Sequence, residues 1–251
     1  MNSLKAWGRS LILSITFFTR IPIPINFSVK EEDFHRGAYF MPLMGAVIGL
    51  LLWGTGEVFS EISPMIRGVL LWILYLAITG GLHMDGLADL SDGIFSNRRG
   101  EALRAVIKDS RIGAFGVLAL ITVALLSVTL FSELSGKALL LGPLWSRSVA
   151  FMVMGYGVYP EGEKGLGKGF VERIGGKAAF IAVLFPALLT IILFQAATLL
   201  FFIPVVILAR WIPKWMEKRF GGVTGDGIGF SIEVFQCLSY LAVYFFILGY
   251  K

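Results

Sequence analysis

Charge and cysteine are both scarce in this chain. Charged residues make up 16% of its 251 positions and hydrophobic residues 56%, with a mean hydropathy of +0.78. Ordinary globular chains are about 25% charged and about 45 to 50% apolar, so these values exclude one soluble core and favour an integral membrane protein. The one cysteine, Cys237, excludes a disulfide framework and a cysteine-rich metal site. Any metal must therefore be bound by oxygen ligands or by the two histidines, His35 and His83.

Positive charge is in moderate excess, with a formal net charge of +5. In a membrane protein this excess arises from Lys and Arg in the cytoplasmic loops. We therefore predict no nucleic-acid partner, and the lipid bilayer is the expected surrounding.

Seven apolar runs are long enough to cross a bilayer, whose hydrocarbon core of about 30 Å needs about 20 apolar residues per helix. They cover residues 38–58, 66–82, 113–131, 138–157, 178–194, 197–212 and 229–249. The fifth and sixth runs are divided only at residues 195–197, so six spans is the nearest alternative within a range of six to eight. We predict an all-α, polytopic membrane helix bundle that forms a single domain over residues 1–251.

The basic side chains indicate which side of the membrane each loop occupies. Eighteen of the 22 Lys and Arg residues fall in the segments 5–36, 98–111, 164–177 and 210–219, which alternate with the predicted spans. Because cytoplasmic loops carry the excess of positive charge, we predict a multi-pass cell-membrane protein with these segments and the N-terminus in the cytoplasm. Residues 4–20 are too short and too interrupted to span, and their amphipathic pattern predicts a helix lying in the interface.

Three of the six aspartates, Asp85, Asp89 and Asp92, fall within the segment GGLHMDGLADLSDG at 80–93. The spacing i, i+4 and i+7 places them on one face of a helix, within about 40° of one another. Such like charges repel, and a hard divalent cation relieves the repulsion; Mg²⁺ prefers a few carboxylates together with substrate phosphate oxygens. The alternative is a solvated acidic loop. His83 is a candidate ligand, general base or interfacial polar residue, and we favour a role close to the metal or the substrate.

The segment KDSRIGAFG at 108–116 carries further candidates. Asp109 would add a fourth carboxylate to the metal site, while Lys108 and Arg111 would bind phosphate oxygens. The structural alternative is that Asp109 or Ser110 caps the N-terminus of the third span.

Two later cytoplasmic loops are rich in glycine. In the loop 160–177, Lys164 and Lys168 could bind phosphates, although the spacing of a P-loop is absent and contact with anionic lipid is an equal alternative. The loop 221–233 contributes Asp226, and Glu233 lies about one turn into the last span. Arg147 lies inside the fourth span, where an ionisable residue is a functional candidate. A structural ion pair of Arg147 with Glu233 or Glu57 is the alternative.

Taken together, FFTRIPIP (17–24), GGLHMDGLADLSDG (80–93), KDSRIGAFG (108–116), GLGKGF (165–170) and TGD (224–226) resemble the cobalamin synthase family, the adenosylcobinamide-GDP ribazoletransferases. The resemblance implies a Mg²⁺-dependent membrane transferase whose substrates are adenosylcobinamide-GDP and α-ribazole or its 5′-phosphate. The ribose hydroxyl would attack the phosphorus on the cobinamide arm, and GMP would leave. A homo-oligomer is compatible with the sequence.

The resemblance also suggests roles for the candidates. Asp85, Asp89 and Asp92 would hold one or two Mg²⁺, and Lys108, Arg111, Lys164 and Lys168 would bind the GDP phosphates. Asp226 and Glu233 would complete the metal site or orient the acceptor hydroxyl.

Two alternatives remain at this stage. Asp89-x-x-Asp92-Gly93 is similar to the opening of the CDP-alcohol phosphotransferase signature, but its continuation is absent. A transporter would use Arg147 and Glu233 within the membrane, although the acidic cluster lies at a membrane edge rather than near the midplane.

Overall fold

The structure is a computed structural model that describes residues 2–249, which contain helices and no strand. Seven long helices run along the bundle axis: α3 (Met41–Val58), α4 (Pro64–Thr79), α7 (Ala114–Glu133), α8 (Ala138–Tyr156), α10 (Gly176–Leu193), α11 (Leu199–Phe220) and α12 (Gly225–Gly249). Six helical segments in this range are long and apolar enough to cross a membrane, and α4 adds a seventh when paired with α5 (Met84–Phe95). The predicted polytopic helix bundle is confirmed.

The centre of the bundle is α8. Its residues from Ala138 to Met154 are all buried, and it packs against α3, α10, α11 and α12. Small residues permit the closest of these contacts, because a Cβ on Gly49 of α3 would lie 2.5 Å from the carbonyl oxygen of Leu140. A helix buried on all sides carries no lipid-facing stripe, which agrees with the polar residues it holds at its centre.

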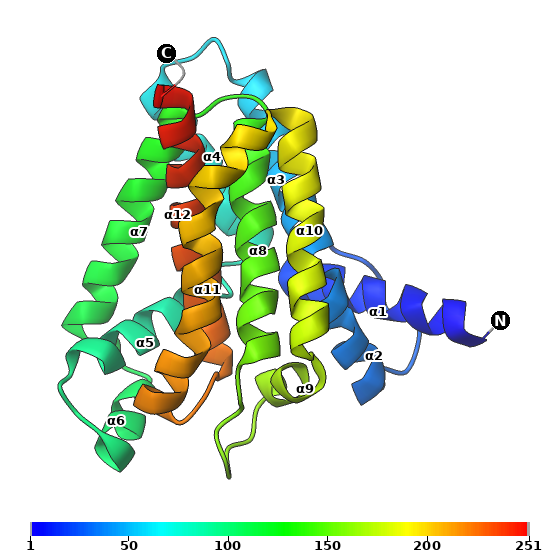
Figure 1. The fold of residues 1–251 in the computed structure, drawn as a ribbon, viewed down its shortest axis with the longest axis vertical. Helices are drawn as coiled ribbons and strands as arrows, with labels where there is room; N and C mark the ends of the chain where they lie inside the picture. The colour runs from blue at the N-terminus through cyan, green and yellow to red at the C-terminus, as the bar shows by residue number, and fades with distance from the viewer. Residues whose placement is uncertain (1, 250–251) are drawn as a thin grey trace.

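A sharp turn separates α4 from α5. The two helices are bent by 97° at a short break in which Gly80 and Gly81 have φ angles of +65° and +64°, a conformation that glycine adopts without steric cost. The turn ends the second span at Thr79 and directs α5 across the end of the bundle (Figure 1).

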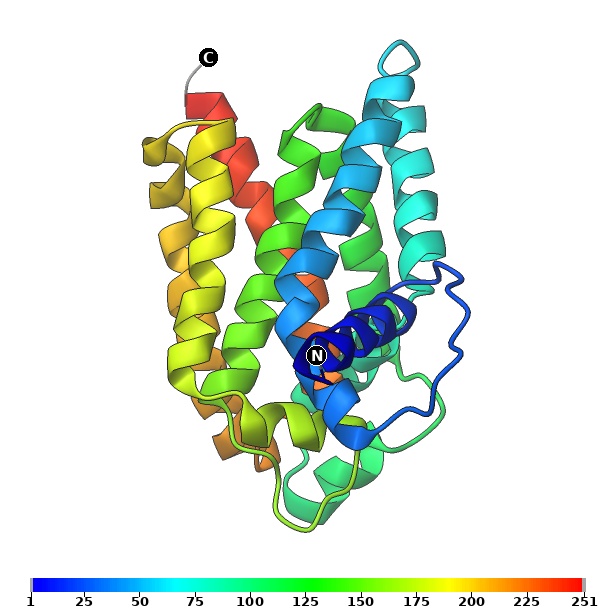
Figure 2. The same ribbon diagram turned by 90° about the vertical axis from the view of Figure 1, so that its right-hand side faces the viewer.

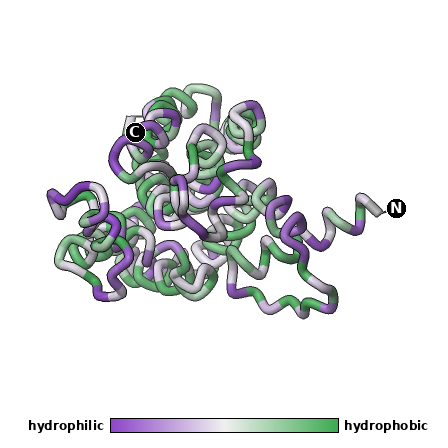
Figure 3. Tube along the Cα trace, turned by 90° about the horizontal axis from the view of Figure 1, so that it is seen from below, coloured by the Kyte–Doolittle hydropathy of each residue, from purple (hydrophilic) through white to green (hydrophobic). Residues whose placement is uncertain are grey.

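The short helices gather toward this same end. They are α1 (Asn2–Phe18), α2 (Glu31–Gly37), α6 (Gly100–Ile107) and α9 (Leu166–Arg173), while the 3-10 turns η1 (Ala38–Phe40) and η2 (Ala196–Thr198) precede α3 and α11. Figures 1 and 2 show α1 projecting sideways from the bundle, as expected of a helix lying in the interface, and α10 and α11 as separate helices that both pack against α8. The apolar tract at 178–212, which could have been one span, therefore forms two helices, α10 and α11. Seen from this end, hydrophilic segments lie in the connecting loops (Figure 3).

Candidate functional site

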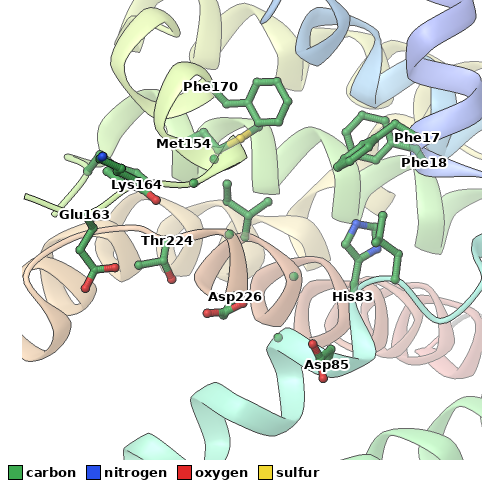
Figure 4. A pocket seen from close by; sticks show the side chains of 18 of the residues that line it. Phe17, Phe18, His83, Asp85, Met154, Glu163, Lys164, Phe170, Thr224 and Asp226 are labelled. Atoms are coloured by element: carbon green, nitrogen blue, oxygen red, sulfur yellow. The ribbon is translucent and has the colours of Figure 1, made fainter. Parts of the chain in front are cut away.

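A cavity of about 390 Å³ opens at this end of the bundle, between α1, α5, α9 and the first turn of α12. Five of the residues singled out from the sequence line it: His83, Asp85, Lys108, Lys164 and Asp226. Figure 4 shows Asp85 and Asp226 along one wall and Phe17, Phe18 and Phe170 across the opening from them. The cavity therefore combines an acidic wall with an aromatic one.

Close packing of α5 against α12 brings the two aspartates to one wall. A Cβ on Gly86 would lie 2.8 Å from the Cα atom of Asp226, so only glycine lets the two backbones approach this closely. Asp85 precedes that glycine and is exposed at the cavity, whereas Asp226 occupies the first turn of α12. Carboxylates from α5 and α12, which are distant in the sequence, thus meet in one site.

Positive charge reaches the same cavity from two loops. Lys108 follows α6, and its Nζ lies 3.4 Å from Oε1 of Glu163, while Lys164 belongs to the loop before α9. The N-terminus of α12 adds the first backbone N–H groups of that helix, at Gly225 and Asp226, which also line the cavity. Lysines and a helix N-terminus are both favourable for phosphate oxygens.

Asp89 lies half-buried behind this wall, one turn after Asp85 on α5, and does not line the cavity. Burial and, to a smaller extent, the negative charges of Asp85, Asp226 and Asp92 together raise the pKa of Asp89 to about 6. Carboxylates that resist ionisation because of one another form an electrostatic environment that favours a cation.

The carboxylate of Asp92 points away from the cavity, toward the N-terminus of α7. Its Oδ2 accepts a hydrogen bond from the backbone N–H of Gly113 at 2.7 Å, and its Oδ1 accepts one from Gly116 at 2.9 Å. Asp92 therefore caps α7 from a neighbouring helix. The alternative that Asp109 or Ser110 caps this helix is wrong, because α7 begins at Ala114 and neither side chain reaches its amides.

Three further candidates lie outside the cavity and have partners of their own. Arg111 donates to both carboxylate oxygens of Asp109, at 3.0 and 2.8 Å, and these bonds hold the pKa of Asp109 well below its usual range. Nζ of Lys168 lies 3.8 Å from Oε1 of Glu172, one turn further along α9. The structure thus separates Asp109, Arg111 and Lys168 from the two aspartates at the cavity wall.

A buried polar network lies deeper in the bundle. Arg147 on α8 donates hydrogen bonds to Gln236 and, at 2.9 Å, to the hydroxyl of Tyr75, which donates to Oε1 of Glu233 at 2.8 Å. That same oxygen lies 3.8 Å from Nδ1 of His83 at the cavity. Arg147 and Glu233 do not line the cavity. The expected pairing of Arg147 with Glu233 therefore runs through Tyr75, and the network leads from the membrane interior to the site.

Comparisons with known proteins agree with this arrangement. The family described as "Cobalamin-5-phosphate synthase" matches residues 10–244. The chain belongs to this family. It is 39% identical to a protein of Alkaliphilus oremlandii over 94% of this chain and 97% of the relative, and 35% identical to one of Acetivibrio thermocellus over 95% and 98%. A third, from Caldanaerobacter subterraneus, is 34% identical over 99% of this chain and 100% of its own length.

All three relatives are named adenosylcobinamide-GDP ribazoletransferase. No solved structure matches the chain significantly. Membership of the cobalamin-5-phosphate synthase family confirms the prediction of a transferase in cobalamin biosynthesis, and therefore of an enzyme rather than a transporter.

For a member of the cobalamin-5-phosphate synthase family, the donor set of the cavity fits Mg²⁺. Among residues 2–249, no three His, Cys, Asp or Glu side chains gather into a complete metal site. Mg²⁺ does not require one, since it usually takes one or two carboxylates and completes its octahedron with water and substrate phosphates. Asp85 and Asp226 supply that number of carboxylates beside Lys108 and Lys164.

Several residues of the site have no distinctive sequence signal. Glu163 lines the cavity and lies within 4 Å of Lys108 and Arg104, yet it resembles any loop glutamate. Tyr75 and Gln236 complete the buried network, and only the position of Gln236 three residues after Glu233, on one helical face, could have suggested a link. The aromatic wall at Phe17, Phe18 and Phe170 is indistinguishable in sequence from ordinary core residues.

The cap formed by Asp92 leads to a prediction about stability. We expect Asp92→Ala to destabilise the protein by about 1 to 2 kcal/mol, because two amides of α7 lose their acceptor. Asp92→Asn keeps one acceptor oxygen and should lose less. Unfolding midpoints in detergent measure the difference. An Asn variant with an unchanged midpoint but a turnover reduced 100-fold would instead assign Asp92 to the metal.

Proposed function

We propose that this chain transfers the phosphocobinamide group of adenosylcobinamide-GDP to the ribose hydroxyl of α-ribazole or its 5′-phosphate and releases GMP. The observation that carries the proposal is the meeting of Asp85, Asp226, Lys108 and Lys164 in one cavity at the end of the bundle. Displacement of a nucleotide from a pyrophosphate requires neutralisation of charge on phosphate oxygens more than it requires a protein nucleophile. The names of the relatives support the same substrates.

The residues divide into roles according to their place around the cavity. Lys108, Lys164 and the N-terminus of α12 bind the GDP phosphates, since these are the positive groups that line it. The acceptor hydroxyl oxygen forms a bond to the phosphorus on the cobinamide arm, the bond from that phosphorus to the GMP oxygen breaks, and the hydroxyl proton passes to the departing GMP phosphate. His83 lines the cavity, whereas His35 does not, and burial together with the charge of Arg147 lowers the pKa of His83 to about 3, so that it orients the hydroxyl as a neutral hydrogen-bond acceptor.

Mg²⁺, bound by Asp85 and Asp226, would supply charge neutralisation at the pyrophosphate as the bond to GMP breaks. The aromatic wall at Phe17, Phe18 and Phe170 gives the acceptor base an apolar surface. A cavity of about 390 Å³ lies at the low end of small-molecule sites, so the phosphates and the acceptor occupy it and the corrin ring stays outside.

The direct test uses purified full-length protein in detergent with adenosylcobinamide-GDP, α-ribazole and Mg²⁺. We expect release of GMP that depends on all three components, together with formation of the joined corrinoid. The matched control replaces adenosylcobinamide-GDP with CDP-diacylglycerol. Absence of GMP release from folded protein contradicts the proposal, and turnover of the lipid substrate would favour the CDP-alcohol phosphotransferase reaction.

The proposed orientation places the cavity and the basic loops in the cytoplasm. A cysteine introduced as Lys168→Cys should therefore resist a membrane-impermeant thiol reagent applied from outside the cell, because α9 lies at the cavity end of the bundle. The natural Cys237 is buried and contributes no background. Glu61→Cys, in the exposed loop between α3 and α4 at the other end, is the positive control. Rapid labelling at position 168 from outside the cell would show that the protein has the opposite orientation in the membrane.

A further inference from the structure

A second cavity lies at the same end of the bundle, between the start of α6 and the last turns of α11. Its volume is about 420 Å³, and Arg99, Gly100, Trp215, Lys218 and Arg219 line it. None of these residues lines the cavity that holds Asp85 and Asp226. The proposed function makes no use of it.

The charge of this second cavity is entirely positive. Among the residues that the structure describes, no carboxylate lies within ion-pair distance of Arg99, Lys218 or Arg219. Arg219 makes only two long hydrogen bonds, at 3.4 Å, to the carbonyl oxygens of Gly93 and Ile94. Three cations facing one hollow without a counter-charge repel one another, and an anion there would relieve the repulsion.

Placement of Lys218 and Arg219 at the C-terminus of α11 is favourable without any ligand, because cations stabilise that end of a helix. Helix capping does not account for Arg99, which precedes α6 and comes from a different segment of the chain. The cavity requires both segments, so its positive character is a property of their packing.

The position of this second cavity along α11 indicates what kind of anion would bind in it. Trp211 is 56% exposed and stacks on Trp215 with ring centroids 6.5 Å apart, one turn before the basic residues. Exposed tryptophans are typical of the level where the hydrocarbon core meets the headgroups. The cavity therefore lies just beyond the apolar part of a span, at the depth of lipid phosphates.

We propose that this cavity binds the headgroup of an anionic phospholipid from the cytoplasmic leaflet. Arg99, Lys218 and Arg219 contact the lipid phosphate, and Trp215 packs against the glycerol region. Basic residues near the membrane surface each strengthen binding to anionic lipid roughly fivefold.

Native mass spectrometry of the full-length protein from micelles with equal phosphatidylglycerol and phosphatidylcholine tests this assignment. We expect the wild-type protein to retain phosphatidylglycerol preferentially. The double variant Arg99→Gln/Lys218→Gln should bind it at least 5-fold more weakly. The control Lys30→Gln/Lys177→Gln removes the same charge from two exposed positions outside the cavity and should keep the wild-type preference.

Release of GMP by the double variant shows that it is folded, since neither residue lines the catalytic cavity. Equal phosphatidylglycerol binding by wild type and double variant overturns the proposal. Displacement of the lipid by inorganic phosphate or GMP at constant ionic strength also overturns it and assigns the cavity to a soluble phosphate ligand. If the lipid preference holds while GMP release fails in the wild type, only the catalytic proposal is lost.

Discussion

Asp85→Asn and Asp226→Asn are each expected to lower turnover by at least 100-fold, on the scale of about 10²- to 10³-fold for loss of one transition-state charge stabiliser. The two carboxylates share one wall of the cavity, and replacing either by an amide removes a negative charge that the proposed Mg²⁺ would need. GMP release under saturating substrates measures the effect. The Mg²⁺ concentration for half-maximal activity should rise in both variants.

Asp109→Asn is the matched control for these substitutions. It makes the same change of charge on the same side of the bundle, but Asp109 is bound to Arg111 and does not line the cavity. We expect its turnover to stay within about threefold of the wild type, because Asp109 does not line the cavity and most surface substitutions change stability by no more than about 0.5 kcal/mol. Folded Asp85→Asn or Asp226→Asn protein with near-normal turnover would refute the assignment of the metal to this wall.

The acidic helix shows how far periodicity alone can lead. The spacing of Asp85, Asp89 and Asp92 correctly places all three on one helix, α5. The spacing does not predict which groups each carboxylate contacts, because residues seven apart lie about 10 Å from each other along a helix axis even when they share a face. Asp85 consequently reaches the cavity, while Asp92 reaches the amides of Gly113 and Gly116.

Contacts between residues that are distant in the sequence are a second feature that sequence patterns cannot predict. Hydropathy and the distribution of basic residues suffice for the bundle, because span length and loop charge are local properties. The meeting of Asp85 with Asp226 depends on the missing side chain of Gly86, which lets α12 pack against α5. One sequence contains many glycines, and nothing in its pattern identifies the one that another helix approaches.

The buried network illustrates the same limit for polar residues. Charge alone marks Arg147 and Glu233 as unusual within their spans, and a direct ion pair is the simplest expectation for them. The connection instead passes through Tyr75, an uncharged residue that hydropathy does not distinguish from its apolar neighbours. Three helices, α4, α8 and α12, are thereby joined at one point.

Arg147→Met should destabilise the protein by about 3 to 5 kcal/mol, the usual cost of removing one member of a buried charged group while its partners stay. Arg147 is 1% exposed, and its loss leaves Gln236 and the carboxylate of Glu233 without a positive partner. Unfolding midpoints in detergent, measured also for Glu233→Gln and the double variant, give the coupling between the two sites. The double variant should lose less stability than the sum of the two single losses, because it leaves no uncompensated buried charge, whereas each single variant leaves one. Additive losses, or a wild-type midpoint in Arg147→Met, would refute the network as a stabilising unit.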